Sequence, residues 1–451
     1  MSKISNKQIL RRNMCASTTD ATFYGVMIGV GETYLPAFAL AIGLGEVMAG
    51  LIASVPLMAG GIIQLISIRP ITKGFDKRTW IVLWSGLQAL AFIPLILAAW
   101  RGSISGPLLL LVSSIYWAGS LASGPAWNMW IETMIPKPIR AGYFAKRTRA
   151  TQIATLTAFV CAGIYLQYAK QQEFLTNAFA VLFVVGIISR AISVVALARH
   201  HDQERPGRPK VALPIANTAQ PISGRHLLVF LVLVQAMVQL SGPYFTPYML
   251  KQLELSYLGF TGLVSVAFVA KIISLVGWGA LARKKGAPWL LTLGGTLIVP
   301  LSAFWIVSPS YYWLVFIQTI NGIAWAAYEL GFFLMFFEAI PTHQRVRMLS
   351  YYNMANTTAW CIGSTMGAII LRSLGTDLAA YHTLFVLSAV GRIFAVAYLY
   401  YHRPSVPVKV VRVGLRVLGL RPSAAPIETP ILPSLADDEV TADLRGPEVE
   451  A

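Results

Sequence analysis

Twelve apolar runs of membrane length dominate this chain of 451 residues. A helix needs about 20 apolar residues to cross a bilayer whose hydrocarbon core is about 30 Å thick, and each run meets that requirement. Only 12% of the residues are charged, against about 25% in a soluble globular protein. The sequence therefore predicts an all-α polytopic membrane protein with spans at 19–42, 46–68, 79–100, 106–131, 151–170, 176–198, 226–249, 256–282, 287–307, 311–337, 352–373 and 378–401.

The basic residues lie mostly on one side of these spans. Of the 36 Lys and Arg, 29 fall in the N-terminal segment, alternate loops and the C-terminal tail, four fall in the other loops, and three lie within spans. Because basic loops stay in the cytoplasm, we expect a multi-pass protein of the cytoplasmic (inner) membrane with both termini in the cytoplasm. Topology then explains the formal net charge of +17, and no nucleic-acid partner is expected.

The longest polar interruption divides the chain into two sets of six spans. It is Pro-rich and follows the sixth span. The basic, apolar start of the tail can lie on anionic membrane lipids, and a solvated tail with no specific role is the alternative. The predicted domains are an N-terminal half at 1–198, a cytoplasmic central loop at 199–225, a C-terminal half at 226–402 and a cytoplasmic, largely disordered tail at 403–451.

The two halves contain matching segments. LFVVGIISRAISVVALARH at 182–200 and LFVLSAVGRIFAVAYLYYH at 384–402 share Leu, Phe, Val, Arg, Val, Leu and His in register. This match makes Arg190 and Arg392 equivalent positions in the sixth and twelfth spans. A Glu, a Pro and an Arg also recur in order after the fourth and tenth spans, in ETMIPKPIR and EAIPTHQR. Parallel repeats of this kind are a recurrent transporter architecture.

With these features, residues 15–402 resemble the major facilitator superfamily. That family has the pattern G-x-L-A-D-R/K-x-G in the loop between the second and third helices of each half, and GALARKKG at 279–286 is similar to it. The residues that fit are Gly279, Leu281, Ala282, Lys284 and Gly286. Arg283 stands where the family has Asp. The resemblance implies two pseudo-symmetric six-helix halves whose first and fourth helices line a central pathway.

Polar and aromatic side chains recur at helical spacing within several spans. Residues three or four apart share a helix face, and Gln318, Asn321, Trp325 and Glu329 follow this spacing. Such a stripe is penalised against lipid but not against a water-filled cavity, and helix–helix contacts are the alternative. The residues predicted to form the substrate and proton pathway are Glu32, Tyr116, Trp127, Gln235, Gln239, Lys271, Gln318, Asn321, Trp325, Tyr328, Glu329, Asn356 and Trp360.

Ionisable groups lie deep inside some spans. Such a group costs about 2.5–3.5 kcal/mol at the bilayer centre and marks a candidate functional site. Lys271 can pair with either Glu32 or Glu329, and each carboxylate either forms a static ion pair or binds a proton or substrate. Arg190 and Arg392 are interpreted as structural, because substrate sites are rarely so symmetric.

A second group of residues lies at the predicted cytoplasmic ends of helices. Opposite charges at these ends predict ion pairs of a cytoplasmic gate, and solvated surface charges are the alternative. The residues of this predicted gate and loop motif are Glu132, Arg140, Gly279, Arg283, Lys284, Gly286, Glu338 and Arg345.

These features predict a secondary active transporter that moves a small organic solute by alternating access, coupled to protons. A sensor or partner subunit of the same fold and a lipid or drug exporter are the alternatives. The three cysteines form no metal-ligand pattern, and the chain lacks the Gly-rich phosphate loop of an ATPase. We therefore expect no enzyme activity, no cofactor and no metal, and a protein that acts as a monomer.

Overall fold

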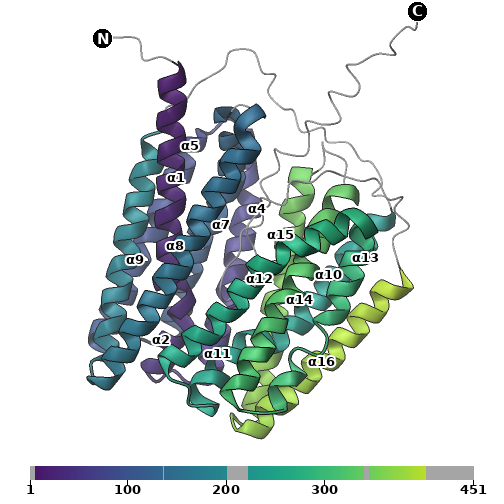
Figure 1. Cartoon of the computed structure of the whole chain (residues 1–451). Coiled ribbons are helices and arrows are strands. Elements are labelled where there is room, and N and C mark those ends of the chain that lie inside the picture. Colours follow the sequence, from purple (N-terminus) through teal and green to yellow (C-terminus); the bar gives the residue numbers. More distant parts are fainter. Residues whose placement is uncertain (1–5, 136, 201–221, 340–344, 403–451) are drawn as a thin grey trace, which may run out of the picture.

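The computed structural model describes residues 6–135, 137–200, 222–339 and 345–402, which form a helical bundle without β-strands (Figure 1). Nine described segments are long and apolar enough to cross a membrane. The predicted spans at 311–337 and 352–373 each lie within one helix, and the span at 287–307 consists of two helical elements separated by turns at 298–302. The all-α polytopic fold is thus confirmed.

The first six predicted spans contain ten helical elements, because three of the spans are broken. In the first span a 3-10 turn, η1, separates α1 from α2. The elements are α1 (Asn6–Val30), η1 (Glu32–Tyr34), α2 (Leu35–Ala41), α3 (Glu46–Ile52), α4 (Val55–Thr72), α5 (Lys77–Leu90), α6 (Phe92–Arg101), α7 (Gly106–Met134), α8 (Lys137–Gln171) and α9 (Leu175–Ala198).

The last six spans repeat part of this pattern. The first of them is again broken by a 3-10 turn, η2, and ends in a short π-helix, η3. The elements are α10 (Ile222–Ser241), η2 (Gly242–Tyr244), α11 (Phe245–Pro247), η3 (Tyr248–Gln252), α12 (Tyr257–Lys285), α13 (Ala287–Leu297), η4 (Ala303–Ile306), α14 (Tyr311–Ala339), α15 (Arg345–Leu374) and α16 (Leu378–Tyr401).

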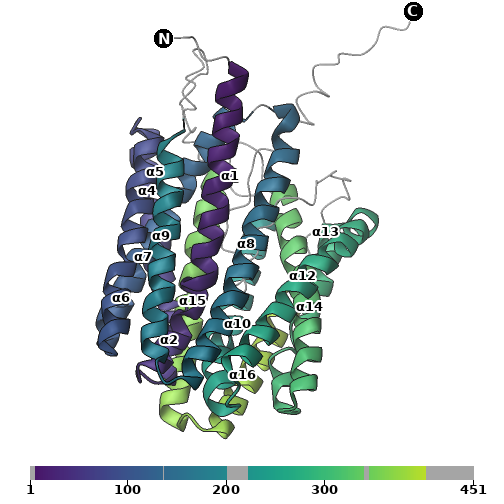
Figure 2. The same ribbon diagram turned by 60° about the vertical axis from the view of Figure 1, so that its left-hand side comes forward.

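Each half is held together by its own helix pairs. In the first half α1 packs along α8 and α9, and α4 packs along α7; in the second half α10 packs along α15 and α16, and α12 along α14. The halves meet where α4 contacts α15 and α8 contacts α12. Figures 1 and 2 show the two groups, purple to teal and teal to yellow, with the start of α1 and the end of α16 at one end of the bundle. We call this the terminal end and the other the opposite end.

The outer faces of the helices carry large apolar side chains. Trp100 on α6, Val276 on α12 and Phe394 on α16 are each at least 70% exposed. A soluble protein rarely exposes contiguous apolar surface of this kind. These faces are therefore suited to contact lipid, as expected for a multi-pass membrane protein.

Several helices extend beyond the apolar runs that predict them. α1 begins at Asn6 rather than at 19, and α12 continues to Lys285. The stretch GALARKKG, predicted as a loop, therefore forms the end of α12, and only Gly286, with a φ of +86°, turns the chain. Hydropathy identifies the part of a helix that lipid surrounds. Polar helix ends outside the lipid are therefore not predicted by it. The central loop lies largely, and the tail at 403–451 entirely, outside the described residues, and the domain limits stay predictions.

Candidate functional site

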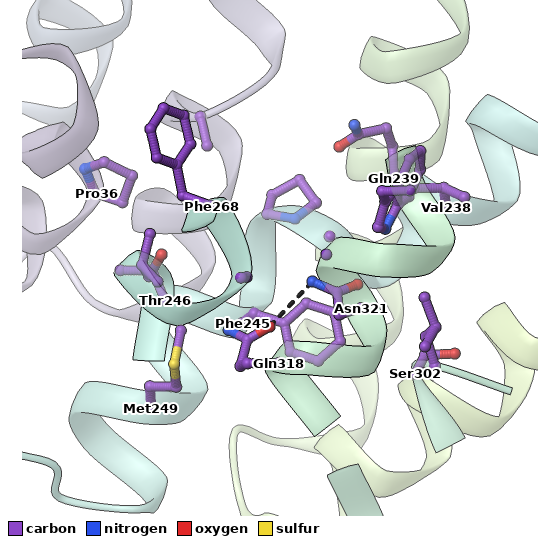
Figure 3. Close-up of a pocket in the computed structure, with 18 of the residues that line it drawn as sticks. Pro36, Val238, Gln239, Phe245, Thr246, Met249, Phe268, Ser302, Gln318 and Asn321 are labelled. Carbon is purple, nitrogen blue, oxygen red and sulfur yellow. Dashed lines mark hydrogen bonds between the residues drawn. The ribbon is translucent and has the colours of Figure 1, made fainter. Parts of the chain in front are cut away.

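A cavity of about 230 Å³ lies between the two halves (Figure 3). The first half contributes residues of η1, α2, α3 and α7, and the second half contributes residues of every α-helix from α10 to α16 except α13. Figure 3 shows Pro36 of the first half and Gln239 of the second on different sides of this space. The predicted pathway residues that line it are Glu32, Gln239, Lys271, Gln318, Asn321, Trp325, Glu329 and Trp360.

Broken helices form part of the cavity wall. Glu32 belongs to the turn η1, and Gly242 and Pro243 belong to the turn η2. Proline has no backbone N–H and disrupts the helical ladder, so Pro243 helps to explain the second break. Interrupted helices near the middle of the membrane are the usual place for substrate and ion sites in transporters.

Lys271 and Glu329 form an ion pair in this wall. The distance from Lys271 Nζ to Glu329 Oε1 is 2.6 Å, and the two side chains are only 9% and 6% exposed. The structure thus answers which carboxylate Lys271 meets. Glu329 Oε2 has no hydrogen-bond partner among the described residues. One oxygen of this buried carboxylate therefore has hydrogen-bonding capacity that no described residue uses.

Glu32 lies in the wall contributed by the first half. Its Oε2 accepts a 2.8 Å hydrogen bond from the hydroxyl of Tyr116 on α7. Tyr116 is buried beside this carboxylate and packs edge-on against Phe92 and Trp117. The two carboxylates of the cavity thus have different partners, an ammonium for Glu329 and a phenol for Glu32.

Amide side chains add hydrogen-bonding capacity. Asn321 Nδ2 donates to Gln318 Oε1 at 3.0 Å, the bond drawn as a dashed line in Figure 3. Trp360 Nε1 donates to Gln235 Oε1 at 3.2 Å. That bond orients Trp360 at the cavity while Gln235 supports it from behind, since Gln235 is not among the lining residues.

Four other predicted pathway residues also fall outside the lining of this cavity. Tyr116 supports Glu32 as described above, and Tyr328 is buried in the apolar core of the second half. Asn356 is buried on α15. Trp127 lies nearer the terminal end, where the guanidinium of Arg147 sits 4.4 Å from its ring centroid. Spacing of three or four residues predicted that these residues share a helix face with the pathway. It could not predict which residues of that face reach the cavity.

The predicted gate falls mostly outside the described side chains. The structure does not describe the side chains of five of its residues, namely Glu132, Arg140, Arg283, Glu338 and Arg345. Gly279 is buried in α12, Lys284 is exposed, and Gly286 caps the helix. The gate ion pairs therefore stay a prediction.

Comparison with known sequences adds the family. The profile of the Major Facilitator Superfamily matches residues 15–364, well over half of the chain. The chain belongs to the major facilitator superfamily. No curated protein matches it significantly.

Solved structures of other transporters share this major facilitator fold. An auto-inhibited peptide transporter of the POT family has a TM-score of 0.69 at 13% identity, covering 89% of this chain and 99% of its own. The nucleoside transporter NupG reaches 0.62 at 11% identity, over 88% and 100% of the two chains. A bacterial homologue of the iron transporter ferroportin in its inward-facing state scores 0.65 at 16% identity, over 89% and 100%. Such low identities show the fold alone.

The halves of this major facilitator protein are hydrogen-bonded to each other near the opposite end. Glu46 of α3 accepts bonds from Tyr381 of α16 at 2.5 Å and from Gln252 of η3 at 3.2 Å. Tyr34 of η1 is 2.8 Å from Thr261 of α12. The outward-facing state of the ferroportin homologue gives a TM-score of only 0.52, against 0.65 for its inward-facing state. The present structure thus superposes better on the inward-facing state of that homologue than on its outward-facing state.

Sequence reasoning missed three functional or structural residues. Asp20 is buried and paired with two arginines, but it lies at the edge of the first apolar run and was not among the ionisable groups predicted to lie deep inside a span. Arg392 lines the cavity, although its symmetry indicated a structural role. Glu46 joins the halves; it begins the second run, and its partners are more than 200 residues away in sequence, so only the tertiary fold reveals them.

Proposed function

We propose that this protein is a secondary active transporter that moves a small organic solute across the cytoplasmic membrane, coupled to protons. The family and the transporter neighbours support membrane transport rather than catalysis. The observation that carries the coupled mechanism is the Lys271–Glu329 pair in the wall of a cavity between two halves.

The pair couples protonation to the state of the cavity by simple electrostatics. A proton on Glu329 removes the negative charge that holds Lys271, and a buried ammonium without a partner is strongly unfavourable. Protonation is therefore tolerated when water or a solute stabilises Lys271. Loss of the proton restores the pair, which favours a dry, occluded cavity. Binding, proton transfer and closure are thereby linked.

Alternating access fits the contacts between the halves. The hydrogen bonds of Glu46 close the opposite end in this structure, and basic loops place the terminal end in the cytoplasm. The protein is then in an inward-facing state, and transport requires the Glu46 contacts to open. We propose that a single chain carries out this cycle as a monomer.

Transport currents test the proposal. Purified protein in proteoliposomes on a solid-supported membrane is challenged with glucose, benzoate, benzylamine, uridine and dialanine at two pH values. We expect a pH-sensitive current with one of these classes, absent from Glu329→Gln and retained by Glu254→Gln, an exposed control carboxylate on the same half. A current that Glu329→Gln leaves unchanged contradicts the proposed coupling.

The two alternatives predict different outcomes of the same experiment. A lipid or drug exporter of this fold remains silent with these polar solutes but moves a fluorescent lipid or a hydrophobic dye. A sensor or partner subunit moves neither, although it binds a ligand in the cavity.

A further inference from the structure

The equivalent arginines of the two halves have different surroundings. Arg190 on α9 and Arg392 on α16 occupy matching positions of the repeat, and both are at least 95% buried. A guanidinium remains charged in proteins, so each burial must be compensated. The groups that compensate the buried charge in each half indicate whether the arginine is structural or binds a ligand.

Arg190 is neutralised within the first half. Its Nη1 lies 3.8 Å from Asp20 Oδ1, and its guanidinium donates to Ser193 at 2.7 Å and Ser85 at 2.8 Å. The guanidinium also lies 4.9 Å from the ring centroid of Tyr24. With a carboxylate, two hydroxyls and an aromatic face, this arginine needs no ligand.

Within the part of the chain that the structure describes, Arg392 has only neutral hydrogen-bond partners. It donates to the carbonyl oxygen of Ile298 at 2.9 Å and to the hydroxyl of Ser241 at 3.2 Å. No carboxylate of the described residues lies within the 4.0 Å of an ion pair, which is the difference from Arg190, since the Nε of both arginines lacks a hydrogen-bond partner among those residues. Its positive charge is therefore not balanced by any neighbouring side chain that the structure describes.

Helix ends hold this arginine in place. Ile298 follows the last residue of α13, and Ser241 is the last residue of α10 before η2. The carbonyl end of a helix carries partial negative charge, which favours a nearby cation. These contacts orient Arg392 but supply only part of the compensation that a full charge requires.

Arg392 forms part of the cavity wall. The other cation there, Lys271, is already paired with Glu329 at 2.6 Å. The cavity wall also includes Gln239 (Figure 3), whose side-chain amide carries two N–H donors, and aromatic rings such as Trp305 and Phe245. A charged group, polar donors and apolar rings together match a solute with an anionic head and an apolar body.

We propose that the central cavity binds small organic anions, and that Arg392 holds their carboxylate or phosphate group. The proposal rests on the cavity being the substrate site of the proposed transporter, and it names the chemical class of that substrate. A guanidinium binds either oxyanion through charge-assisted hydrogen bonds. Glu329 of the neutral Lys271–Glu329 pair is then protonated or deprotonated while the anion is bound at Arg392.

Binding of matched probes to the purified full-length protein in detergent tests this. One set is benzoate, phenyl phosphate, benzamide and benzylamine; the other is hexanoate, hexanamide and hexylamine. Tryptophan fluorescence and thermal unfolding report binding at pH 7.5. We expect an anion of at least one set to bind at least about tenfold more tightly than its neutral and cationic counterparts. Benzoate against phenyl phosphate separates carboxylate from phosphate recognition.

Variants locate the anion. Arg392→Gln should weaken anion binding at least about tenfold and leave amide binding unchanged. Arg392→Lys keeps the charge. Where the glutamine variant folds, Arg392→Lys should bind anions measurably more tightly than it does. Where the glutamine variant does not fold, Arg392→Lys should bind anions more weakly than the wild type. Arg372→Gln, at an exposed position of the same half, is the control.

Two results overturn the proposal. One is that no anion binds more tightly than its neutral or cationic counterpart. The absence of binding by every probe counts as this result. The other is that both Arg392 variants bind anions as the wild type does. Neither result bears on coupled transport, because a transporter of neutral or cationic solutes still gives the Glu329-dependent current.

Discussion

Two buried charge clusters of this protein look alike in composition and differ in placement. In the first half, Asp20 is held by Arg147 at 3.0 Å and by Ser193 at 2.7 Å, so both carboxylate oxygens have donors. In the second half, Glu329 has a donor on one oxygen only, among the described residues. The Asp20 cluster is not part of the cavity lining, whereas the Lys271–Glu329 pair is.

The difference shows how to separate a structural charge from a functional one. A fully satisfied network fixes one arrangement, while a partly satisfied one has a capacity left for a ligand or proton. Burial alone does not distinguish them, because both carboxylates are over 90% buried. What distinguishes them is that Glu329 Oε2 has no hydrogen-bond partner among the described residues and that the pair of Glu329 and Lys271 lines the cavity.

The largest effect is expected at the first cluster. Asp20→Asn leaves two arginines, Arg147 and Arg190, without their carboxylate, and removing one partner of a buried ion pair costs about 3–5 kcal/mol. We expect a low yield of folded protein and a markedly lower unfolding temperature in detergent. Glu254→Gln serves as the control. Normal thermal stability of Asp20→Asn would show that this cluster is not the scaffold of the first half.

A smaller loss of stability is expected at the second cluster. Glu329→Gln leaves Lys271 without its carboxylate, but both residues border the cavity, and an amide oxygen still accepts the hydrogen bond of the ammonium. We expect a cost on the order of 1–2 kcal/mol, measured by the same unfolding experiment. A cost equal to that of Asp20→Asn would make the two clusters energetically alike and remove the distinction.

A third effect concerns the contact between the halves rather than either cluster. A Cβ at Gly50 would lie 2.2 Å from the ring of Tyr244, and overpacking a close contact costs about 1–3 kcal/mol. Gly50→Ala should therefore favour opening of the opposite end. Electron–electron distances between spin labels at Gln172 and Ser373, with the three native cysteines replaced by serine, should shift to longer values.

The control for this experiment is Gly86→Ala, because a Cβ at Gly86 has no neighbour within 4 Å. Its distance distribution should match that of the wild type. If Gly50→Ala matches it too, the contact between α3 and η2 does not set the state of the opposite end.

The smallest effect is expected at an exposed carboxylate. Hydrogen bonds from the hydroxyl and backbone N–H of Thr79 lower the pKa of Asp76, which caps α5 outside the membrane-spanning segment. A lowered folded pKa means that the stabilisation is complete above the unfolded value of about 3.9 and is lost as the pH falls through the folded value. Asp76→Ala should cost about 1 kcal/mol at pH 7.5.

This difference from the wild type should persist at pH 5 and shrink towards pH 3. Thermal unfolding of both proteins across this range measures it. A difference that grows with acidity would contradict the assignment of Asp76 as an ionised cap.

Much of this architecture could be predicted from sequence because lipid imposes a strong rule. Backbone groups in a bilayer must be paired within the helix, so apolar length alone locates the spans. The match of Arg190 with Arg392 revealed the repeat, and the spacing of Gln318, Asn321, Trp325 and Glu329 found one wall of the cavity, which all four line.

The remaining features depend on contacts between distant segments. Lys271 and Glu329 are 58 residues apart, so the choice of partner needed the packing of α12 on α14. Gly25 and Gly29 let α1 approach α8, where a Cβ would lie 2.5–2.6 Å from backbone carbonyl oxygens, a contact that only the packed structure shows. The different partners of Arg190 and Arg392 were invisible because sequence equivalence does not fix the direction of a long side chain.

The central claim is that the Lys271–Glu329 pair couples protons to transport, and the double variant Lys271→Gln/Glu329→Gln tests it most directly. Removing both charges avoids an unpaired one and leaves the fold intact. In proteoliposomes, with a substrate from the current measurements, the double variant should still exchange labelled for unlabelled solute but should no longer accumulate solute in response to a pH gradient. Accumulation at the wild-type level would contradict the account and show that the pair is a static ion pair.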